Sequence, residues 1–224
     1  MALFEQPKAV DPAKWASALD EKEITGYPLQ TIYKGCINSV LADNKTITNR
    51  LDTLAKEIAD FYQDRPFVIL VVLKGAFVVF KDLYKSLMKI YEEGKYVNNV
   101  TFEFIQLSSY RNTESTGNLT VKGDVILDLS NKEVLIVEDI IDSGNSMAKF
   151  LKFLEVKTPK SVRIFTLVLK ETKTSFLFDV DYVGFLIPNK FVVGYGLDYN
   201  ETFRDLPHLC VISPEGVEKF SVAN

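Results

Sequence analysis

The 224-residue sequence has few of the residues that build metal and disulfide sites. It contains one histidine, His208, and two cysteines, Cys36 and Cys210, which do not form a CxxC pair. A histidine-rich zinc site is therefore excluded, and any bound metal should be held by oxygen atoms. Two isolated cysteines in a chain of this length indicate free thiols in a reducing compartment.

Long apolar runs, a secretory signal and an excess of positive charge are also missing. The longest apolar run, 67–73, is far shorter than the ~20 residues of a membrane helix. The N-terminus has no basic stretch followed by an apolar core. The 26 basic and 30 acidic residues give a net charge of −4, which argues against a nucleic-acid surface. We therefore expect a cytoplasmic protein with neither a nucleic-acid nor a membrane partner.

Hydrophobic residues make up 47% of the chain and charged residues 25%, which are values typical of a globular protein. Apolar residues at helical spacing alternate with short apolar runs typical of buried strands. This alternation predicts an α/β fold with a central, mainly parallel, twisted sheet flanked by helices. Helices are expected within 47–61, 77–88 and 147–154, and strands at 67–73, 100–107, 133–139, 162–169, 180–187 and 191–197.

The length favours a single domain covering residues 1–224. We expect a core at about 41–187 and a small hood formed by about 1–40 and 188–224. The polar segment 108–120 should form a long mobile loop. In parallel sheets ligands bind beyond the carboxyl ends of the strands, so the residues that end each apolar run are candidates for function.

The most informative of these ends follows the expected strand 133–139. Glu138 and Asp139 end the strand, Asp142 comes next, and the small residues 143–146 open a helix. Backbone N–H groups at a helix N-terminus bind phosphate, whereas adjacent carboxylates repel it unless they face hydroxyls or hydrated Mg²⁺. A ribose 5-phosphate satisfies both groups, with its hydroxyls on Glu138 and Asp139. Its phosphate would lie on Asp142, Ser143, Gly144, Asn145 and Ser146.

A simpler interpretation is that Asp142 and Ser143 only cap the following helix. Capping leaves the adjacent Glu138 and Asp139 at the strand end unexplained. A P-loop nucleotide site is excluded, because no GxxxxGK[ST] motif is present.

The segment VLIVEDIIDSGNSM at 134–147 resembles the phosphoribosyl pyrophosphate signature of type I phosphoribosyltransferases. The similarity continues through LKG at 73–75, SSY at 108–110, Lys170 and 190–206, and is closest to the hypoxanthine-guanine members over about 45–213. The resemblance implies a type I phosphoribosyltransferase fold. It also implies purine salvage by transfer of 5-phosphoribosyl from phosphoribosyl pyrophosphate to N9 of hypoxanthine or guanine. The products would be IMP or GMP and pyrophosphate.

The same resemblance assigns roles toward the phosphoribosyl donor. Lys74 and Gly75, after a cis peptide bond at Leu73–Lys74, would bind pyrophosphate together with Arg204. Ser109 and Tyr110 would belong to a lid that closes over the reaction and excludes water. Mg²⁺ is the implied cofactor, on Asp198 and on the carboxylates that bind the ribose, Glu138 and Asp139.

Toward the purine, the resemblance makes Asp142 the general acid or base at N7. Lys170 would donate to the 6-oxo group, Phe191 would stack on the ring, and the Val192 backbone would contact the base edge. Lys190 and Asp198 complete the implied purine site. A homodimer or homotetramer is also implied.

Two alternatives stay open from the residues. A regulator could keep this fold and bind nucleotides without turnover, since a fold does not grant activity. A transferase could also act on another base. Lys170 argues against adenine, because an ammonium only donates hydrogen bonds and the 6-amino group of adenine also donates.

Overall fold

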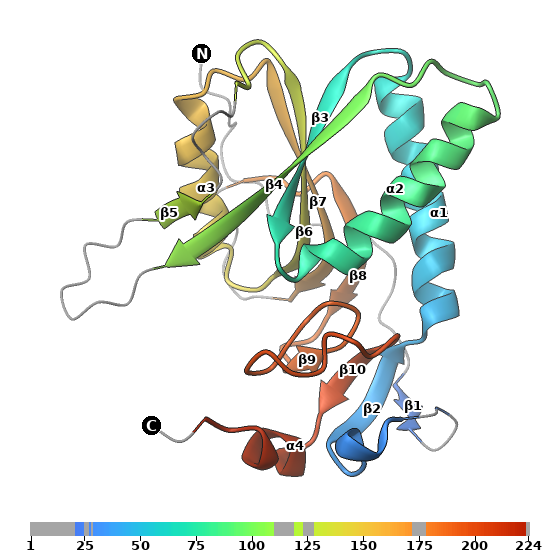
Figure 1. Ribbon diagram of the computed structural model, residues 1–224, viewed down its shortest axis with the longest axis vertical. Coiled ribbons are helices and arrows are strands. Elements are labelled where there is room, and N and C mark those ends of the chain that lie inside the picture. Colours follow the sequence, from blue (N-terminus) through green and yellow to red (C-terminus); the bar gives the residue numbers. More distant parts are fainter. Residues whose placement is uncertain are drawn as a thin grey trace.

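The computed structural model describes residues 21–24, 27, 29–109, 119–122, 128–171 and 178–222. Its larger sheet has six strands in the order β5-β4-β3-β6-β7-β8 (Figure 1). Five of them are parallel, and β5 is antiparallel to β4. The predicted mainly parallel α/β fold is confirmed. The strands are β3 (Phe67–Leu73), β4 (Val100–Ser109), β5 (Leu119–Lys122), β6 (Glu133–Ile141), β7 (Ser161–Lys170) and β8 (Tyr182–Ile187).

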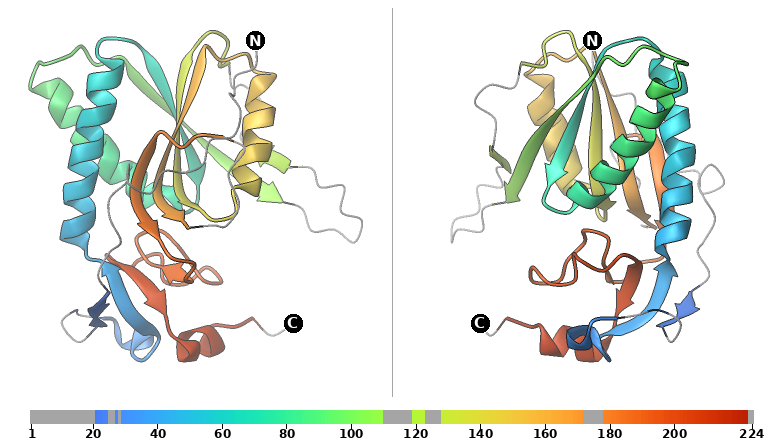
Figure 2. Two further views of the ribbon diagram at one scale, coloured as in Figure 1. Left: turned by 180° about the vertical axis from the view of Figure 1, so that it is seen from behind. Right: turned by 45° about the vertical axis from the view of Figure 1, so that its right-hand side comes forward.

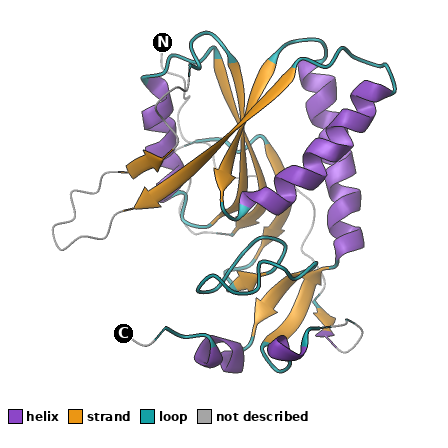
Figure 3. Ribbon diagram, in the orientation of Figure 1, coloured by secondary structure: helices purple, strands orange, loops and turns teal. Residues whose placement is uncertain are grey.

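Both faces of this sheet are covered by helices, which explains why the central strand β3 is apolar at every position. Helices α1 (Asn44–Tyr62) and α2 (Ala76–Glu92) cover one face, and α3 (Asn145–Glu155) covers the other (Figure 3). Alternate residues of β3 enter the two cores. Phe67, Ile69 and Val71 pack with α1 and α2, whereas Val68, Leu70 and Val72 pack on the side of α3.

The helices follow the predicted apolar spacing with two exceptions, Phe61 near the end of α1, whose side chain is 36% exposed, and Phe77 in α2. In α1, Ile47, Leu51, Leu54 and Ile58 are buried as expected. In α2, the side chain of Phe77 is 52% exposed, so its predicted place in the buried stripe is wrong. The stripe starts one residue earlier because α2 begins at Ala76, and it continues through Val79, Phe80, Leu83 and Leu87.

A second, antiparallel sheet forms a hood from both ends of the chain, in the order β1-β2-β10-β9. The carboxyl ends of the parallel strands point toward this hood (Figure 2). The division of residues 1–224 into core and hood stays a prediction, since 1–20 lie outside the described residues. The hood strands are β1 (Lys22–Glu23), β2 (Ile37–Ala42), β9 (Val192–Val193) and β10 (Leu209–Ile212), with the 3₁₀ turn η3 (Thr31–Tyr33) and helix α4 (Pro214–Lys219) beside them.

Two predicted segments differ from the structure. The expected strand 191–197 is reduced to Val192–Val193, because Gly194, Tyr195 and Gly196 all have positive φ and turn the chain. The expected loop 108–120 is shorter, since the backbone of β4 pairs through Ser109 with β5. Such pairing uses backbone groups, so a polar sequence does not prevent it. The rest of that loop, 110–118, lies outside the described residues.

Neither cysteine is in a disulfide, and both are buried, as expected for free thiols. No helix in the described part of the chain has the length and apolar character needed to cross a bilayer.

The hood is fastened to the core at the start of α1. His208 Nδ1 accepts a hydrogen bond from the Asn44 N–H at 3.1 Å, and the Asn44 side chain donates to the Pro207 carbonyl at 3.3 Å. The ring of Tyr27 packs edge-on against His208, and Asp43 caps the helix through the Thr46 N–H. Burial lowers the pKa of His208 from its ordinary value of 6.5, with a smaller opposing effect of Asp43. The fold therefore favours neutral His208.

Neutral His208 should make stability depend on pH. Its contribution is fully present above the unfolded pKa of 6.5 and is lost as the pH falls through the lowered folded value. His208→Gln retains an acceptor but cannot titrate. We expect the stability advantage of the wild type over this variant to shrink from pH 7.5 to 5, by about 1 kcal/mol, the contribution of one hydrogen bond. Urea unfolding across this range measures it, and a constant difference would contradict the role of His208.

Candidate active site

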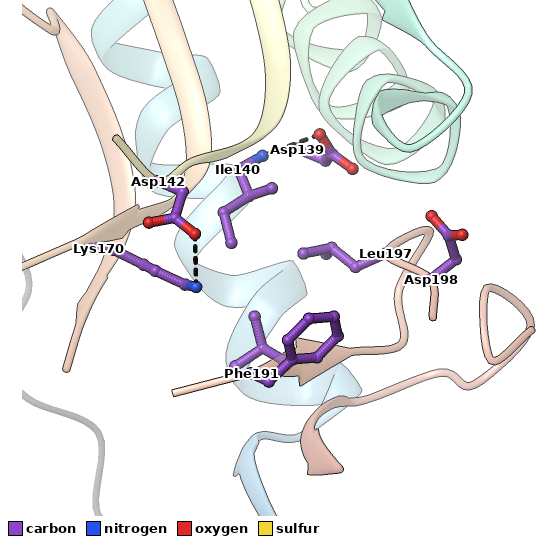
Figure 4. A pocket seen from close by; sticks show the side chains of 8 residues that line it. Asp139, Ile140, Asp142, Lys170, Phe191, Leu197 and Asp198 are labelled. Carbon is purple, nitrogen blue, oxygen red and sulfur yellow. Dashed lines mark hydrogen bonds and ion pairs between the residues drawn. The ribbon is translucent and has the colours of Figure 1, made fainter. Parts of the chain in front are cut away.

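A pocket of about 170 Å³ lies between the carboxyl ends of the strands and the hood (Figure 4). Strands β6 and β7 contribute its acidic and basic groups, and the segment 191–198 contributes the opposite wall. The structure thus brings residues from distant parts of the sequence to one place. The lining residues are Asp139, Ile140, Asp142, Lys170, Phe191, Val192, Leu197 and Asp198.

Lys170 and Asp142 form an ion pair at the edge of this pocket (Figure 4). The Lys170 Nζ lies 2.7 Å from Asp142 Oδ2, and the exposed fractions of the two side chains are 9% and 60%. Lys170 ends β7 and Asp142 follows β6, and these strands are parallel neighbours. The pair therefore presents a hydrogen-bond donor and a proton acceptor side by side.

Glu138 and Asp139 lie together at the end of β6, and both are partly buried. Burial, followed by repulsion from Asp139, raises the pKa of Glu138 well above its ordinary value. Burial also raises the pKa of Asp139, while the nearby Arg204 has an opposing effect. The Asp139 carboxylate accepts a hydrogen bond from the Ile140 N–H at 2.9 Å. A ligand that brings hydroxyls or a cation would favour the ionised form of this pair.

The segment Ser143–Ser146 leads into α3 as predicted. Gly144 is the N-cap of the helix, adopts a left-handed conformation (φ 74°) and has no side chain to cap the first turn, while Ser143 Oγ accepts a long hydrogen bond of 3.5 Å from the Asn145 N–H. Of the two capping residues considered, Ser143 makes this one contact, whereas the role of Asp142 is wrong, because its carboxylate pairs with Lys170 instead. The other N–H groups at the N-terminus of α3 suit an anion.

Gly75 is surrounded so closely that it has no room for a side chain. A Cβ added there would lie 1.6 Å from Asp139 Oδ2, and one added at Gly196 would lie 2.3 Å from the Gly75 carbonyl oxygen. The peptide bond between Leu73 and Lys74 is cis, as the sequence resemblance implied. The strand end of β6, the turn after β3 and the hood loop are thus stacked on one another.

Lys74 and Arg204, the two predicted pyrophosphate cations, are linked by Glu201. The Glu201 Oε2 atom lies 3.0 Å from Lys74 Nζ and 3.5 Å from an Arg204 NH2 group. Arg204 also pairs with Asp198 at 2.7 Å and donates to the Gly196 carbonyl at 2.8 Å. Sequence reasoning missed Glu201, although an acidic residue between Asp198 and Arg204 was a visible signal.

Other predicted residues are not brought into the pocket. The Lys190 side chain pairs with Glu21 and does not line it. Ser109 is described only as part of β4, and Tyr110 lies outside the described residues, so the lid stays a prediction. Sequence reasoning also missed the apolar lining residues Ile140 and Leu197, because nothing in the sequence pattern distinguishes them from residues of the core.

The donor set fits Mg²⁺ only if a ligand completes it. The described residues hold no group of three or more acidic, histidine or cysteine side chains that could bind a metal alone. Asp139 and Asp198 both line the pocket. Mg²⁺ usually takes one or two carboxylates and completes its shell with waters and substrate phosphates. These carboxylates therefore suit an ion that arrives with a diphosphate.

Comparison with known proteins agrees with this geometry. The hypoxanthine-guanine-xanthine phosphoribosyltransferase of Plasmodium falciparum is 39% identical over 211 residues, which are 91% of both chains. The hypoxanthine-guanine phosphoribosyltransferase of Mus musculus is 38% identical over 215 residues, 93% of this chain and 99% of that one. The crystal structure of a Schistosoma mansoni hypoxanthine-guanine phosphoribosyltransferase in complex with IMP superposes with a TM-score of 0.76 and 34% identity, covering 90% of this chain and 94% of that one.

A family model, the phosphoribosyl transferase domain, matches residues 38–200. The match covers well over half of the chain and includes the strand ends that line the pocket. The predicted fold, transferase class and purine-salvage function are confirmed. The chain belongs to the phosphoribosyl transferase domain family.

Proposed function

We propose that this chain transfers the 5-phosphoribosyl group of phosphoribosyl pyrophosphate to N9 of hypoxanthine or guanine, and that the residues at its strand ends carry the reaction. The observation that supports this most directly is the Lys170–Asp142 pair. On a 6-oxopurine, O6 and N7 lie on the same edge. One ammonium and one carboxylate 2.7 Å apart match that edge, with a donor for O6 and a proton acceptor for N7.

In the proposed reaction, the C1′–oxygen bond to pyrophosphate breaks and the N9–C1′ bond forms, while Asp142 takes the proton from N7. Phe191 is 50% exposed at the pocket, which leaves its face available to stack on the purine. The carbonyl and N–H of Val192 would contact the base edge, and Lys190 is proposed only to border it. The C1′ carbon develops positive charge as the leaving group departs, much as in glycoside cleavage.

The donor would bind along three segments. Its 5-phosphate would lie on residues 142–146 at the N-terminus of α3, and its ribose hydroxyls on Glu138 and Asp139. Lys74, Gly75 and Arg204 would bind the pyrophosphate. Lys74 and Arg204 would stabilise the negative charge that builds on the leaving group, and the fixed geometry would lower the entropic cost of the reaction.

We also propose a Mg²⁺ cofactor, cytoplasmic location and a homodimeric or homotetrameric state. Asp198 and the pair Glu138 and Asp139 would hold the ion, which would offset the negative charge of the diphosphate. A lid that includes Ser109 and Tyr110 would exclude water. Light scattering of the purified protein tests its oligomeric state.

An ultraviolet assay tests the function. Purified protein is mixed with phosphoribosyl pyrophosphate, Mg²⁺ and one base at a time, with hypoxanthine, guanine, xanthine and adenine compared. We expect nucleotide formation with hypoxanthine or guanine. Tight nucleotide binding without turnover would instead support a regulator, and turnover only with another base would reassign the acceptor.

Asp142→Asn should lower kcat by roughly 10²-fold or more with little change in substrate binding, since it removes the acid–base group and keeps its shape. Steady-state kinetics with hypoxanthine measure the effect. Near-normal turnover by the variant would remove Asp142 from the mechanism.

Lys170→Met should remove most of the discrimination between bases. The nearly buried ammonium is satisfied by a 6-oxo group and is left facing another donor in adenine. We expect the wild type to prefer 6-oxopurines by roughly 10³-fold in kcat/KM, the scale of rejection based on hydrogen bonds, and the variant to narrow this gap. Lys56→Met, at an exposed position of α1, is the matched control. If the Lys170→Met variant kept the full preference for 6-oxopurines, the donor that discriminates between the bases would have to be another residue.

Gly75→Ala should displace the Asp139 carboxylate, because the new methyl group would lie 1.6 Å from its Oδ2 atom. The side chain of Asp139 can rotate away, so we expect a modest loss of stability, about 1–3 kcal/mol as for other overpacked sites. The loss of kcat/KM for phosphoribosyl pyrophosphate should be larger, roughly 10²-fold, since 1 Å misplacements in active sites have costs of this size. Kinetics and thermal unfolding separate the two effects, and unchanged kinetics would show that Asp139 does not hold the donor.

A further inference from the structure

A single carboxylate oxygen lies between the two cations of the pyrophosphate site. Glu201 Oε2 is 3.0 Å from Lys74 Nζ and 3.5 Å from Arg204 NH2. Lys74 follows β3 in the core and Arg204 belongs to the hood, so this oxygen bridges two separate parts of the fold. One anionic oxygen shared by a lysine and an arginine resembles the contact that a diphosphate oxygen would make.

The backbone that presents Glu201 adopts conformations that are costly for residues other than glycine. Asn200 has φ 50°, Glu201 φ 63° and Phe203 φ 75°. The turn is closed by mutual backbone hydrogen bonds between Tyr199 and Thr202, and the Glu201 N–H donates to Asp198 Oδ2 at 2.8 Å. Such strain persists where the surrounding structure fixes it, and it gathers at ligand sites. The turn therefore holds Glu201 in one place.

Arg204 retains a donor that none of these carboxylates satisfies. Its Nε atom is buried and has no hydrogen-bond partner among the described residues. Its NH1 and NH2 groups are occupied by the Gly196 carbonyl, Asp198 and Glu201. A buried donor without an acceptor is unfavourable, so the unpaired Nε of Arg204 raises the free energy of the ligand-free site.

The charges of the residues around Glu201 are balanced without a ligand. The cations Lys74 and Arg204 are matched by the anions Asp198 and Glu201. The hydrogen bond from Lys74 lowers the pKa of Glu201, so its carboxylate is ionised near neutral pH. A diphosphate that binds Lys74 and Arg204 would therefore meet the negative charge of Glu201 at the same nitrogen atoms.

We propose that Glu201 occupies the position of a pyrophosphate oxygen in the free enzyme, so that the diphosphate must displace it to bind and its return favours release of pyrophosphate. The inference rests on the proposed function only in taking a diphosphate as ligand of Lys74 and Arg204. Glu201 acts through these two cations and is a positioning residue. The exchange is feasible because both side chains of the Lys74–Glu201 pair are more than half exposed and such pairs are weak.

The test is the affinity for inorganic pyrophosphate with Mg²⁺, measured by isothermal titration calorimetry of the full chain. Glu201→Gln removes the competing charge and keeps the size of the side chain. We expect pyrophosphate to bind about threefold to tenfold more tightly, as two weak ion pairs allow. The KM for phosphoribosyl pyrophosphate should fall by a similar factor with kcat within about twofold. Unchanged or weaker binding by the variant would overturn the proposal.

Glu218→Gln is the matched control, because it removes the same charge from α4 of the same hood. Equal tightening by both variants would show a general effect of net charge and would overturn the role of Glu201. Lys74→Met should weaken pyrophosphate binding more in the Glu201→Gln background than in the wild type, since Glu201 masks Lys74. Additive effects would contradict the shared contact.

This assay needs no purine, so a different acceptor base would leave its result valid. If the wild type binds pyrophosphate and Glu201→Gln binds it no better, only this inference fails. If the wild type binds none, the proposed function and the inference both fail.

Discussion

The close approach of three backbone segments at Gly75 is the constraint on which the active site depends. The Asp139 carboxylate occupies the space that a Gly75 side chain would need, and the Gly75 carbonyl occupies the space next to Gly196. These residues come from the end of β6, the start of α2 and the hood loop. Since Gly75 and Gly196 have no side chains, the Asp139 carboxylate packs directly on the Gly75 backbone and the Gly75 carbonyl packs on the Gly196 backbone, which fixes the relative positions of the three segments. The parts of the site that are proposed to bind the phosphoribosyl donor and the purine are thus held at a fixed distance without a ligand.

The proposed donor is highly charged, and its binding to this acidic protein would require the cations of the site to exchange partners. Each of its three cations is paired with a carboxylate in the free protein, Lys170 with Asp142, Arg204 with Asp198, and Lys74 with Glu201. Buried or partly buried charges without partners would destabilise the fold. The same pairs give a ligand cations that are already positioned, at the energetic expense of releasing their carboxylates. This arrangement would allow a chain of net charge −4 to hold phosphate groups without a broad basic surface.

The sequence was most informative where one physical factor decides the structure. The apolar run 67–73 could only be a buried strand, and Glu138 and Asp139, near the end of another buried strand, had to lie at the carboxyl end of the sheet. The turn at Gly194–Gly196 was missed because apolar neighbours favoured a longer strand, while its positive φ angles depend on packing against Gly75 and His208. The pairing of Lys190 with Glu21 and of Lys74 with Glu201 joins residues distant in sequence, and no local pattern specifies such contacts.

The hood also sets an order in which the protein can be completed during synthesis. Strand β2 pairs with β10, and the Ser213 hydroxyl donates to the Gly35 carbonyl across 178 positions of the chain. Closing such a long loop is slow and brings no contact until its second end is present. On the ribosome, β3, β6 and the segment 142–146, which is proposed to bind the 5-phosphate, are synthesised before residues 191–204. The surface proposed to bind the sugar phosphate can therefore form on the nascent chain, while the wall proposed to stack on the base is added only when translation is almost finished.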